Sequence, residues 1–169
     1  MTTAATAETI PTSSLGQTVG RIASVIGADR FPTSERAQLK RLQPNGSPSL
    51  AFYRFAFRHL PEGWDRRPGE WMTLLAGLAL MGQTAHRPDR PAGQALAETG
   101  YAEARLERLL AAEGDTLSTL LLRAARFLAA KNDSCNWTDF AYLLGLGGDP
   151  ERARLQIARA FYRNLKDQE

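Results

Sequence analysis

Apolar residues recur along the chain at the three- and four-residue spacing of one helix face. Leu15, Val19, Ile22 and Ile26 keep this spacing and predict a first helix over about residues 14–27. The same periodicity, interrupted by proline, glycine and asparagine, predicts the remaining helices. These cover about residues 34–42, 49–60, 68–83, 93–99, 102–113, 115–131, 137–145 and 150–165.

Three of the later helices have recognisable start signals. Asp115 and Asn136 stand where an N-cap is expected, and Asp149 is followed by Pro150 and Glu151. An acidic cap, proline at the first helical position and an acid in the first turn are typical of a helix N-terminus. We therefore expect well-defined starts for these three helices.

Two segments bear on the domain organisation. The helix that contains residues 71–82 is apolar nearly all round, so we expect it in the middle of a bundle or at a subunit contact. Residues 84–93 have two prolines, three charged residues and no core formers, which predicts a mobile loop between two lobes. The predicted organisation is a disordered tail (1–14), a basic helical lobe (15–84), a loop (85–92) and a second helical lobe (93–169).

Composition supports a helical fold. Leucine and alanine account for 49 residues, whereas valine and isoleucine account for six. Strands favour β-branched side chains and helices favour leucine and alanine. We predict an all-α, two-lobed helical bundle of about eight to nine helices.

The chain has few residues suited to catalysis or metal binding. Cys135 is the single cysteine, and the two histidines, His59 and His86, lie far apart in the sequence. No zinc, phosphate-loop, dinucleotide or nucleophile motif is present, so we expect no cofactor, no metal and no enzyme activity. The first 14 residues lack the features of a signal peptide, and the longest apolar run, 74–81, is too short to span a bilayer. We expect a soluble cytoplasmic protein with no membrane partner.

The charged residues are unevenly distributed. The net charge is only +3, but 18 of the 21 basic residues are arginine. Residues 21–90 have 11 basic and six acidic residues, whereas residues 101–169 have ten of each. High-GC coding alone produces an arginine bias, while contact with phosphates is the functional alternative, because guanidinium forks bind phosphate well.

Several arginines share helix faces that lack acidic neighbours. Arg36 with Lys40, and Arg54 with Arg58, are spaced i,i+4, and Arg123 with Arg126 is spaced i,i+3. Such faces suit a phosphate backbone, although the face with Arg36 and Lys40 is equally typical of a solvated helix surface. By helical geometry one stripe of the last helix, about 60° wide, holds a further set: Arg152, Arg159, Arg163 and Lys166.

Other residues have a structural interpretation. The rings Phe52, Tyr53, Phe55 and Phe57, which lie among the arginines of the third helix, are more typical of core than of base stacking, as are Trp71 and Trp137. We expect Arg105 and Arg108 to form ion pairs with neighbouring acids inside their helix. Arg154 falls on the buried side of the last helix, so it has to extend to solvent or pair with a carboxylate unless the helix packs differently there.

Several segments, taken in order, resemble the CasB family, the small subunits of the type I-E CRISPR-associated Cascade surveillance complex. The matching elements are Ala37-Gln-Leu-Lys-Arg41, Phe52-Tyr53-Arg54, the apolar helix 71–82, 93–97 with 103–105 and 109–110, 120–123 with 126–128, and Asn136-Trp137 with 151–152 and 158–162. Each motif is weak alone, but the ordered set covers about residues 15–165. The chain departs from the family pattern at Gln94, at Arg126 and in a longer polar N-terminus.

The resemblance implies a non-catalytic, all-α protein that holds nucleic-acid backbone without reading its sequence. It implies contact with the guide RNA and with target or displaced DNA, with the large and backbone subunits of the complex, and with a second copy of the chain. Matched to the family motifs, the expected contact residues are Lys40, Arg41, Arg54, Arg105, Arg123 and Arg126. Charge patterning adds Arg36, Arg58, Arg152 and Arg159 to this candidate set.

A second hypothesis stays open at this point. Under this hypothesis, the chain is a protein-only helical adaptor or dimerisation module. Its apolar helix 71–82 forms the partner contact, and its arginines only keep the surface soluble. Binding of nucleic acid at low salt distinguishes the two hypotheses.

Overall fold

The structure is a computed structural model that describes residues 12–165; the expected tail over residues 1–11 and Lys166 lie outside this range. The described chain forms nine α-helices and two 3₁₀ turns, with no strand beyond one isolated bridge. The helices are α1 (Thr12–Gly27), α2 (Thr33–Lys40), α3 (Leu50–His59), α4 (Pro68–Met81), α5 (Ala92–Glu98), α6 (Glu103–Ala111), α7 (Gly114–Ala130), α8 (Trp137–Leu143) and α9 (Pro150–Asn164). The all-α prediction is confirmed, although α1 begins two residues earlier than expected.

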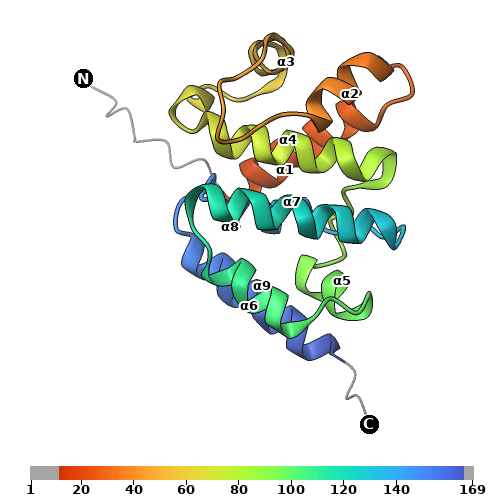
Figure 1. The fold of residues 1–169 in the computed structure, drawn as a ribbon, viewed down its shortest axis with the longest axis vertical. Coiled ribbons are helices and arrows are strands. Elements are labelled where there is room, and N and C mark those ends of the chain that lie inside the picture. Colours follow the sequence, from red (N-terminus) through yellow and green to blue (C-terminus); the bar gives the residue numbers. More distant parts are fainter. Residues whose placement is uncertain (1–11, 166–169) are drawn as a thin grey trace, which may run out of the picture.

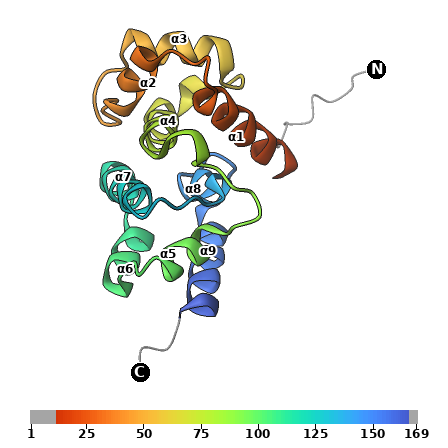
Figure 2. The same cartoon turned by 90° about the vertical axis from the view of Figure 1, so that its right-hand side faces the viewer.

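The helices are stacked along the long axis of the molecule. Figure 1 shows α1, α2 and α3 around α4 at one end, α7 and α8 in the middle, and α5, α6 and α9 at the other end. Figure 2 shows the same order from the side. Helix α4 packs against α2 and α7, and α9 packs against α5 and α8. The division into two lobes stays a prediction.

Helix α4 lies in the middle of the bundle. Its residues 71–79 are all buried, which leaves no apolar face there for another chain. Of the two positions that its composition allows, the structure therefore confirms the interior one. A helix that is apolar all round needs neighbours on every side, and α1, α2, α7 and α8 supply them.

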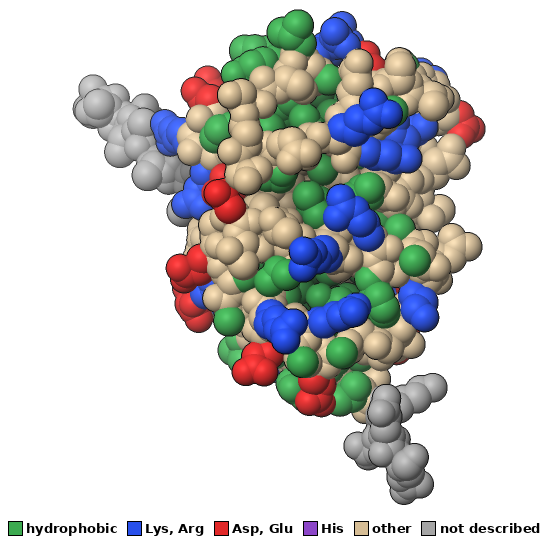
Figure 3. Space-filling model, viewed as in Figure 1, with side chains coloured by type: hydrophobic (Ala, Val, Ile, Leu, Met, Phe, Trp, Pro, Cys, Tyr) green, Lys and Arg blue, Asp and Glu red, His purple; other side chains and the backbone are tan. Residues whose placement is uncertain are grey.

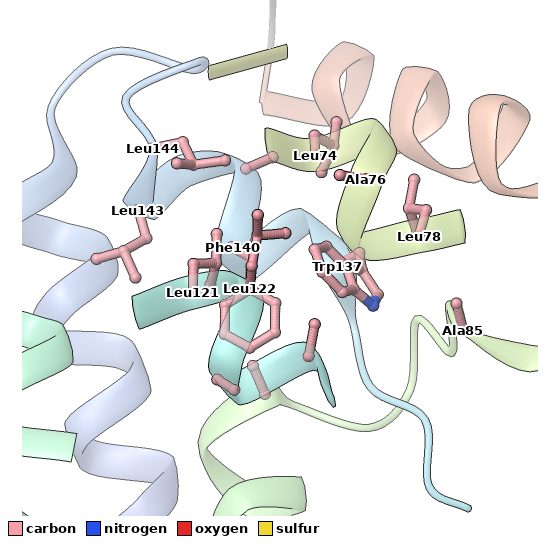
Figure 4. Packing of buried hydrophobic residues seen from close by; sticks show 14 of the residues in the cluster. Leu74, Ala76, Leu78, Ala85, Leu121, Leu122, Trp137, Phe140, Leu143 and Leu144 are labelled. Carbon is pink, nitrogen blue, oxygen red and sulfur yellow. The ribbon is translucent and has the colours of Figure 1, made fainter. Parts of the chain in front are cut away.

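Trp137 joins α8 to α4 at the centre of the core. Its side chain is fully buried, its ring centroid lies 5.0 Å from that of Phe140, and its Nε1 donates a hydrogen bond to the Met81 sulfur at 3.2 Å. Figure 4 shows Trp137 directed toward the helix that holds Ala76 and Leu78. Both Trp137 and Trp71 are core residues, as the sequence predicts.

Two of the three expected capping residues work as predicted. The side chains of Asn136 and Asp149 each accept a hydrogen bond from a backbone N–H in the first turn of α8 and α9. The prediction for Asp115 is wrong. Glu113 takes the extended backbone conformation of the N-cap residue of α7 without a side-chain hydrogen bond, and Asp115 lies in the first turn. At that position its carboxylate still faces the positive end of the helix dipole.

The loop between α4 and α5 is more firmly attached than its composition indicates. Its backbone exchanges hydrogen bonds with the segment that precedes α8, including Arg87 N to Cys135 O at 2.8 Å. The Arg90 side chain is largely buried and forms ion pairs with Glu98 and Asp133 at 2.7 and 2.8 Å. The composition of the loop does not reveal these contacts, because two of the partners, Asp133 and Cys135, lie more than 40 residues away in the sequence.

Gly93 allows a close approach between α5 and α9. A Cβ atom at this position would lie 2.1 Å from the Ile157 carbonyl oxygen, whereas one at Gly16 would meet only an ordinary contact at 3.9 Å. We expect Gly93→Ala to lower the free energy of unfolding by about 1–3 kcal/mol, since backbone has to move. Gly16→Ala should leave it unchanged or raise it by up to about 1 kcal/mol, because alanine favours a helix. Urea denaturation of both variants measures the difference, and equal effects would contradict the close contact.

His86 makes the stability of the fold sensitive to acid. Its Nδ1 accepts a hydrogen bond from Trp137 N at 3.0 Å, and burial lowers the pKa of the imidazole below its ordinary 6.5. The unfolded chain therefore takes up this proton more readily, so this contribution to stability is lost as the pH falls below about 6.5. Burial and the charges of Arg21 and Arg58 lower the pKa of His59 too, which acts in the same direction.

The variant His86→Asn isolates this contribution. The asparagine carbonyl can accept the Trp137 N–H bond and does not titrate. We expect the free energy of unfolding to fall less steeply between about pH 7 and pH 5 than in the parent protein, where His86 changes charge. Denaturant midpoints at several pH values give the two slopes, and parallel slopes would show that His86 has no part in the acid sensitivity.

Candidate nucleic-acid interface

Lysine and arginine side chains gather on the face shown in Figure 3, over α2, α7 and α6. This face has two hollows: a groove between α2 and α7, and a pocket between α6 and α7. We call the basic residues that line them the basic face. They are Lys40, Arg105, Arg108, Arg123 and Arg126.

The buried sides of α6 and α7 direct these arginines outward. Leu106 and Leu109 are the buried residues of α6, and a continuous stripe of α7 that includes Leu121 and Leu128 is buried as well. The i,i+3 spacing places the two arginines of each helix on one face, and all four of these arginines are exposed. The amphipathic pattern that forms the core therefore also builds the basic face.

The groove between α2 and α7 is small and polar. It has a volume of about 240 Å³, and its basic residues are Lys40 from the end of α2 and Arg126 from α7. Asp115 is the acidic residue among its lining, and Gln43, Asn45 and Thr119 add uncharged polar groups. Arg41 is exposed next to Lys40, at the C-cap of α2.

The pocket between α6 and α7 contains no carboxylate. It measures about 380 Å³ and is lined by Tyr101 and Leu120 together with Arg105, Arg108 and Arg123. We expected Arg105 and Arg108 to pair with acids of their own helix, but neither forms an ion pair with any residue in the range that the structure describes. That expectation is wrong, and the guanidinium groups are available for an anion.

Arg36 has a structural role. Its guanidinium group donates hydrogen bonds to the carbonyl oxygens of Ile26, at 2.7 and 3.1 Å, and of Ala28, at 3.1 Å. These carbonyls lie at the C-terminal end of α1, where backbone acceptors lack helical partners and the dipole favours a positive charge. Arg36 therefore joins α2 to α1, and we do not count it in the basic face.

Helix α3 presents arginines beside an exposed apolar stripe. Arg54 lies 3.6 Å from the carboxylate of Glu35 in α2, a pairing that sequence spacing within α3 does not reveal. Arg58 has no ion pair with a described residue. Phe52 and Phe55 are core, as predicted, but Phe57 is 78% exposed and Tyr53 is 38% exposed, so the core prediction fails for these two rings. Leu50 is as exposed as Phe57.

The arginines of α9 line a third hollow away from the basic face. Figure 2 places α9 and α8 on the opposite side of the molecule from α6 and α7. Arg152, Arg159 and Arg163 line a groove of about 550 Å³ that also contains Asp139 and Asp149. Burial raises the pKa of Asp139, whose carboxylate accepts a hydrogen bond from Ala92 N at 2.9 Å. This groove carries mixed charge, unlike the pocket between α6 and α7.

Arg154 follows one of its three expected arrangements. It pairs with carboxylates, those of Glu151 in the same helix and Glu113 before α7, the latter at 4.0 Å. Its Nε atom is shielded from solvent and has no hydrogen-bond partner among the described residues. Arg154 therefore belongs to the contact between α9 and the start of α7.

Sequence reasoning missed Arg108 as a site residue. The available signal was its i,i+3 spacing from Arg105, but the intervening Glu107 and nearby Glu103 indicated ion pairs instead.

Across the part of the chain that the structure describes, no group of three or more His, Cys, Asp and Glu side chains is placed to hold a metal ion. No helix in that part is long and apolar enough to cross a membrane.

Comparison with known proteins places the chain among CRISPR-associated proteins. The family model for CRISPR-associated protein Cse2 matches residues 35–162. The chain is similar to one in the crystal structure of E. coli Cascade bound to a PAM-containing dsDNA target with a 32-nt spacer. The sequence identity is 22%, the TM-score is 0.65, and the match covers 88% of this chain and 94% of the other. At this identity the likeness shows a common fold. No curated protein matches the sequence.

Proposed function

Because the chain belongs to the CRISPR-associated protein Cse2 family, we propose that it is the non-catalytic small subunit of a Cascade antiviral complex. In this role it holds the backbone of nucleic acid without reading its sequence and stabilises the guide RNA–target DNA R-loop. Its partners are the guide RNA, the target or displaced DNA, the large and backbone subunits, and a second copy of itself. The likeness to a chain of DNA-bound E. coli Cascade supports this assignment.

The basic face is the observation that carries the proposal. It has five cationic side chains, none of which forms an ion pair with a described residue. Unpaired surface cations on one face raise the local potential and attract a polyanion. Contacts to phosphate position a strand but carry no base information.

Such contacts matter most where strand exchange is nearly balanced. The RNA–DNA heteroduplex of an R-loop is about as stable as the DNA duplex that it replaces. A small amount of backbone binding energy therefore shifts the equilibrium toward the open state. A subunit with a basic face and no sequence preference supplies this energy at any target, while base pairing selects the target.

Salt dependence of binding tests the proposal. If all five cations of the basic face neutralise phosphates of a single strand, the logarithm of the association constant should fall with the logarithm of salt concentration with a slope of about −3.5. Fluorescence anisotropy of the full-length protein with labelled oligonucleotides gives this slope. Affinity that does not change with salt, or that varies strongly with sequence, would rule out the backbone-contact mechanism.

One observation favours the adaptor alternative, although its partner contact then lies on α3, because residues 71–79 of the apolar helix are buried within the bundle. Leu50, Tyr53 and Phe57 form an exposed stripe on α3, with the outer two side chains each 78% exposed. Large exposed apolar side chains on one helix face are typical of a protein contact. Under this alternative, no mobility shift is seen with any nucleic acid at low salt, whatever the protein concentration.

A further inference from the structure

The pocket between α6 and α7 differs from the rest of the basic face in having an apolar floor. Tyr101 is only 6% exposed and Leu120 is half-buried, whereas Arg105, Arg108 and Arg123 are exposed. The ring and the leucine therefore form the floor, and the three guanidinium groups form the rim. A volume of about 380 Å³ lies within the range of small-molecule sites.

The floor offers one polar group. The Tyr101 hydroxyl has no hydrogen-bond partner among the described residues. Its oxygen is still accessible to solvent, and therefore to a ligand in the pocket. Burial raises the pKa of this hydroxyl, so it stays a donor at neutral pH. The Tyr101 ring is held in place by Phe127, with ring centroids 5.3 Å apart. The floor is thus fixed before a ligand arrives.

The two parts of the pocket indicate different parts of one ligand. Unpaired guanidinium groups suit phosphates, whereas an apolar floor gains little from a hydrated anion. A nucleobase is planar, with apolar faces and polar edges, and it stacks on aromatic rings and on guanidinium planes. In a strand, phosphates flank each base and reach the rim when the base enters. Bases in a duplex are stacked and paired, and so are not available.

We propose that this pocket admits one unstacked base of a single strand, which stacks against the guanidinium planes of the rim above the apolar floor, while its flanking phosphates contact the charges of Arg105, Arg108 and Arg123. The protein then prefers single-stranded over duplex nucleic acid, with tolerance for any base, because every base has a π-face. This inference rests on the proposed function but goes beyond it, since backbone contact alone gives no role to bases. It also gives a role to Arg108, which neither charge patterning nor the family motifs single out.

A strand without bases tests the inference. The full-length protein is titrated with three labelled ligands: a mixed-sequence single strand, its duplex, and a strand of the same length in which abasic sites replace most nucleotides. Because stacking of one base contributes about a tenfold gain in affinity, the base-bearing strand should bind about tenfold more tightly than the abasic strand. Equal affinity for these two strands overturns the inference and leaves the proposed function intact. Binding of none of the three overturns both.

Lysine variants separate stacking from charge. Arg105→Lys with Arg108→Lys keeps the charge of the rim but removes two planar groups. We expect the ratio of affinities for the base-bearing and abasic strands to fall from about ten toward one, with an unchanged salt slope. Arg30→Lys with Arg66→Lys, at two exposed arginines that do not line the basic face, is the matched control and should keep the ratio. If the variant of Arg105 and Arg108 keeps it too, the base does not enter this pocket. A thermal melt of each variant checks that the fold is retained.

Discussion

Replacing Lys40, Arg123 and Arg126 together with glutamine should weaken binding of single-stranded nucleic acid about 30-fold. Exposed ion pairs contribute up to about 1 kcal/mol each, so three phosphate contacts account for about 2 kcal/mol, and a tenfold change corresponds to about 1.4 kcal/mol. The salt slope should become shallower by about 2, because three fewer counterions are released. Anisotropy titrations at several salt concentrations measure both quantities.

A second triple variant controls for net charge. Arg30, Arg66 and Arg87 are exposed and do not line the basic face. Their replacement by glutamine removes the same number of charges and should change affinity about twofold or less, since exposed charges beyond a Debye length are largely screened. Equal losses in the two variants would mean that overall charge, and not the basic face, determines binding. Neither set should shift the melting temperature much, because substitutions at such surface positions usually change stability by at most about 0.5 kcal/mol.

Trp137→Ala should destabilise the fold by about 3–5 kcal/mol. Removal of a fully buried indole leaves a cavity between α8 and α4, and the surrounding helices relax only partly. The substitution also removes the ring contact with Phe140 and the hydrogen bond to the Met81 sulfur. Since a domain of this size is stable by only about 5–15 kcal/mol, the variant should lose a large part of its folded population on mild heating.

Phe57→Ala is the matched control for this truncation. It removes an aromatic side chain that is 78% exposed, so it should cost less than about 1 kcal/mol. Guanidinium denaturation followed by far-ultraviolet circular dichroism gives both free energies. A Trp137→Ala protein as stable as the Phe57→Ala protein would contradict the placement of Trp137 at the centre of the core.

Much of the fold follows from local sequence. The helix boundaries agree with the predicted ranges to within about two residues at most ends, because proline and glycine interrupt the pattern and Asn136 and Asp149 cap their own helices. Asp115 shows the limit of this reasoning. The backbone conformation of Glu113 and Gly114 decided where α7 begins, and local propensity alone does not distinguish starts one or two residues apart.

The candidate site was only partly predictable. Spacing placed Arg123 and Arg126 correctly on an outer face of α7, since the opposite face is apolar. Spacing within one helix did not show that Glu35 lies 3.6 Å from Arg54, or that Arg36 binds the end of α1. It also predicted ion pairs for Arg105 and Arg108 that the structure lacks among the residues it describes.

The sequence by itself determined the helical class, the positions of the helices, the apolar character of α4 on all sides and which side of most helices carries charge. These properties depend on the order of residues within one element, where neighbours are set by helical geometry. The tertiary structure alone decided which arginines are neutralised and which remain available. Attraction between charges falls off with distance and depends on burial, so it is fixed only when packing brings residues from separate helices together. For the same reason, the pocket that joins Arg105 and Arg108 of α6 to Arg123 of α7 exists only in the folded chain.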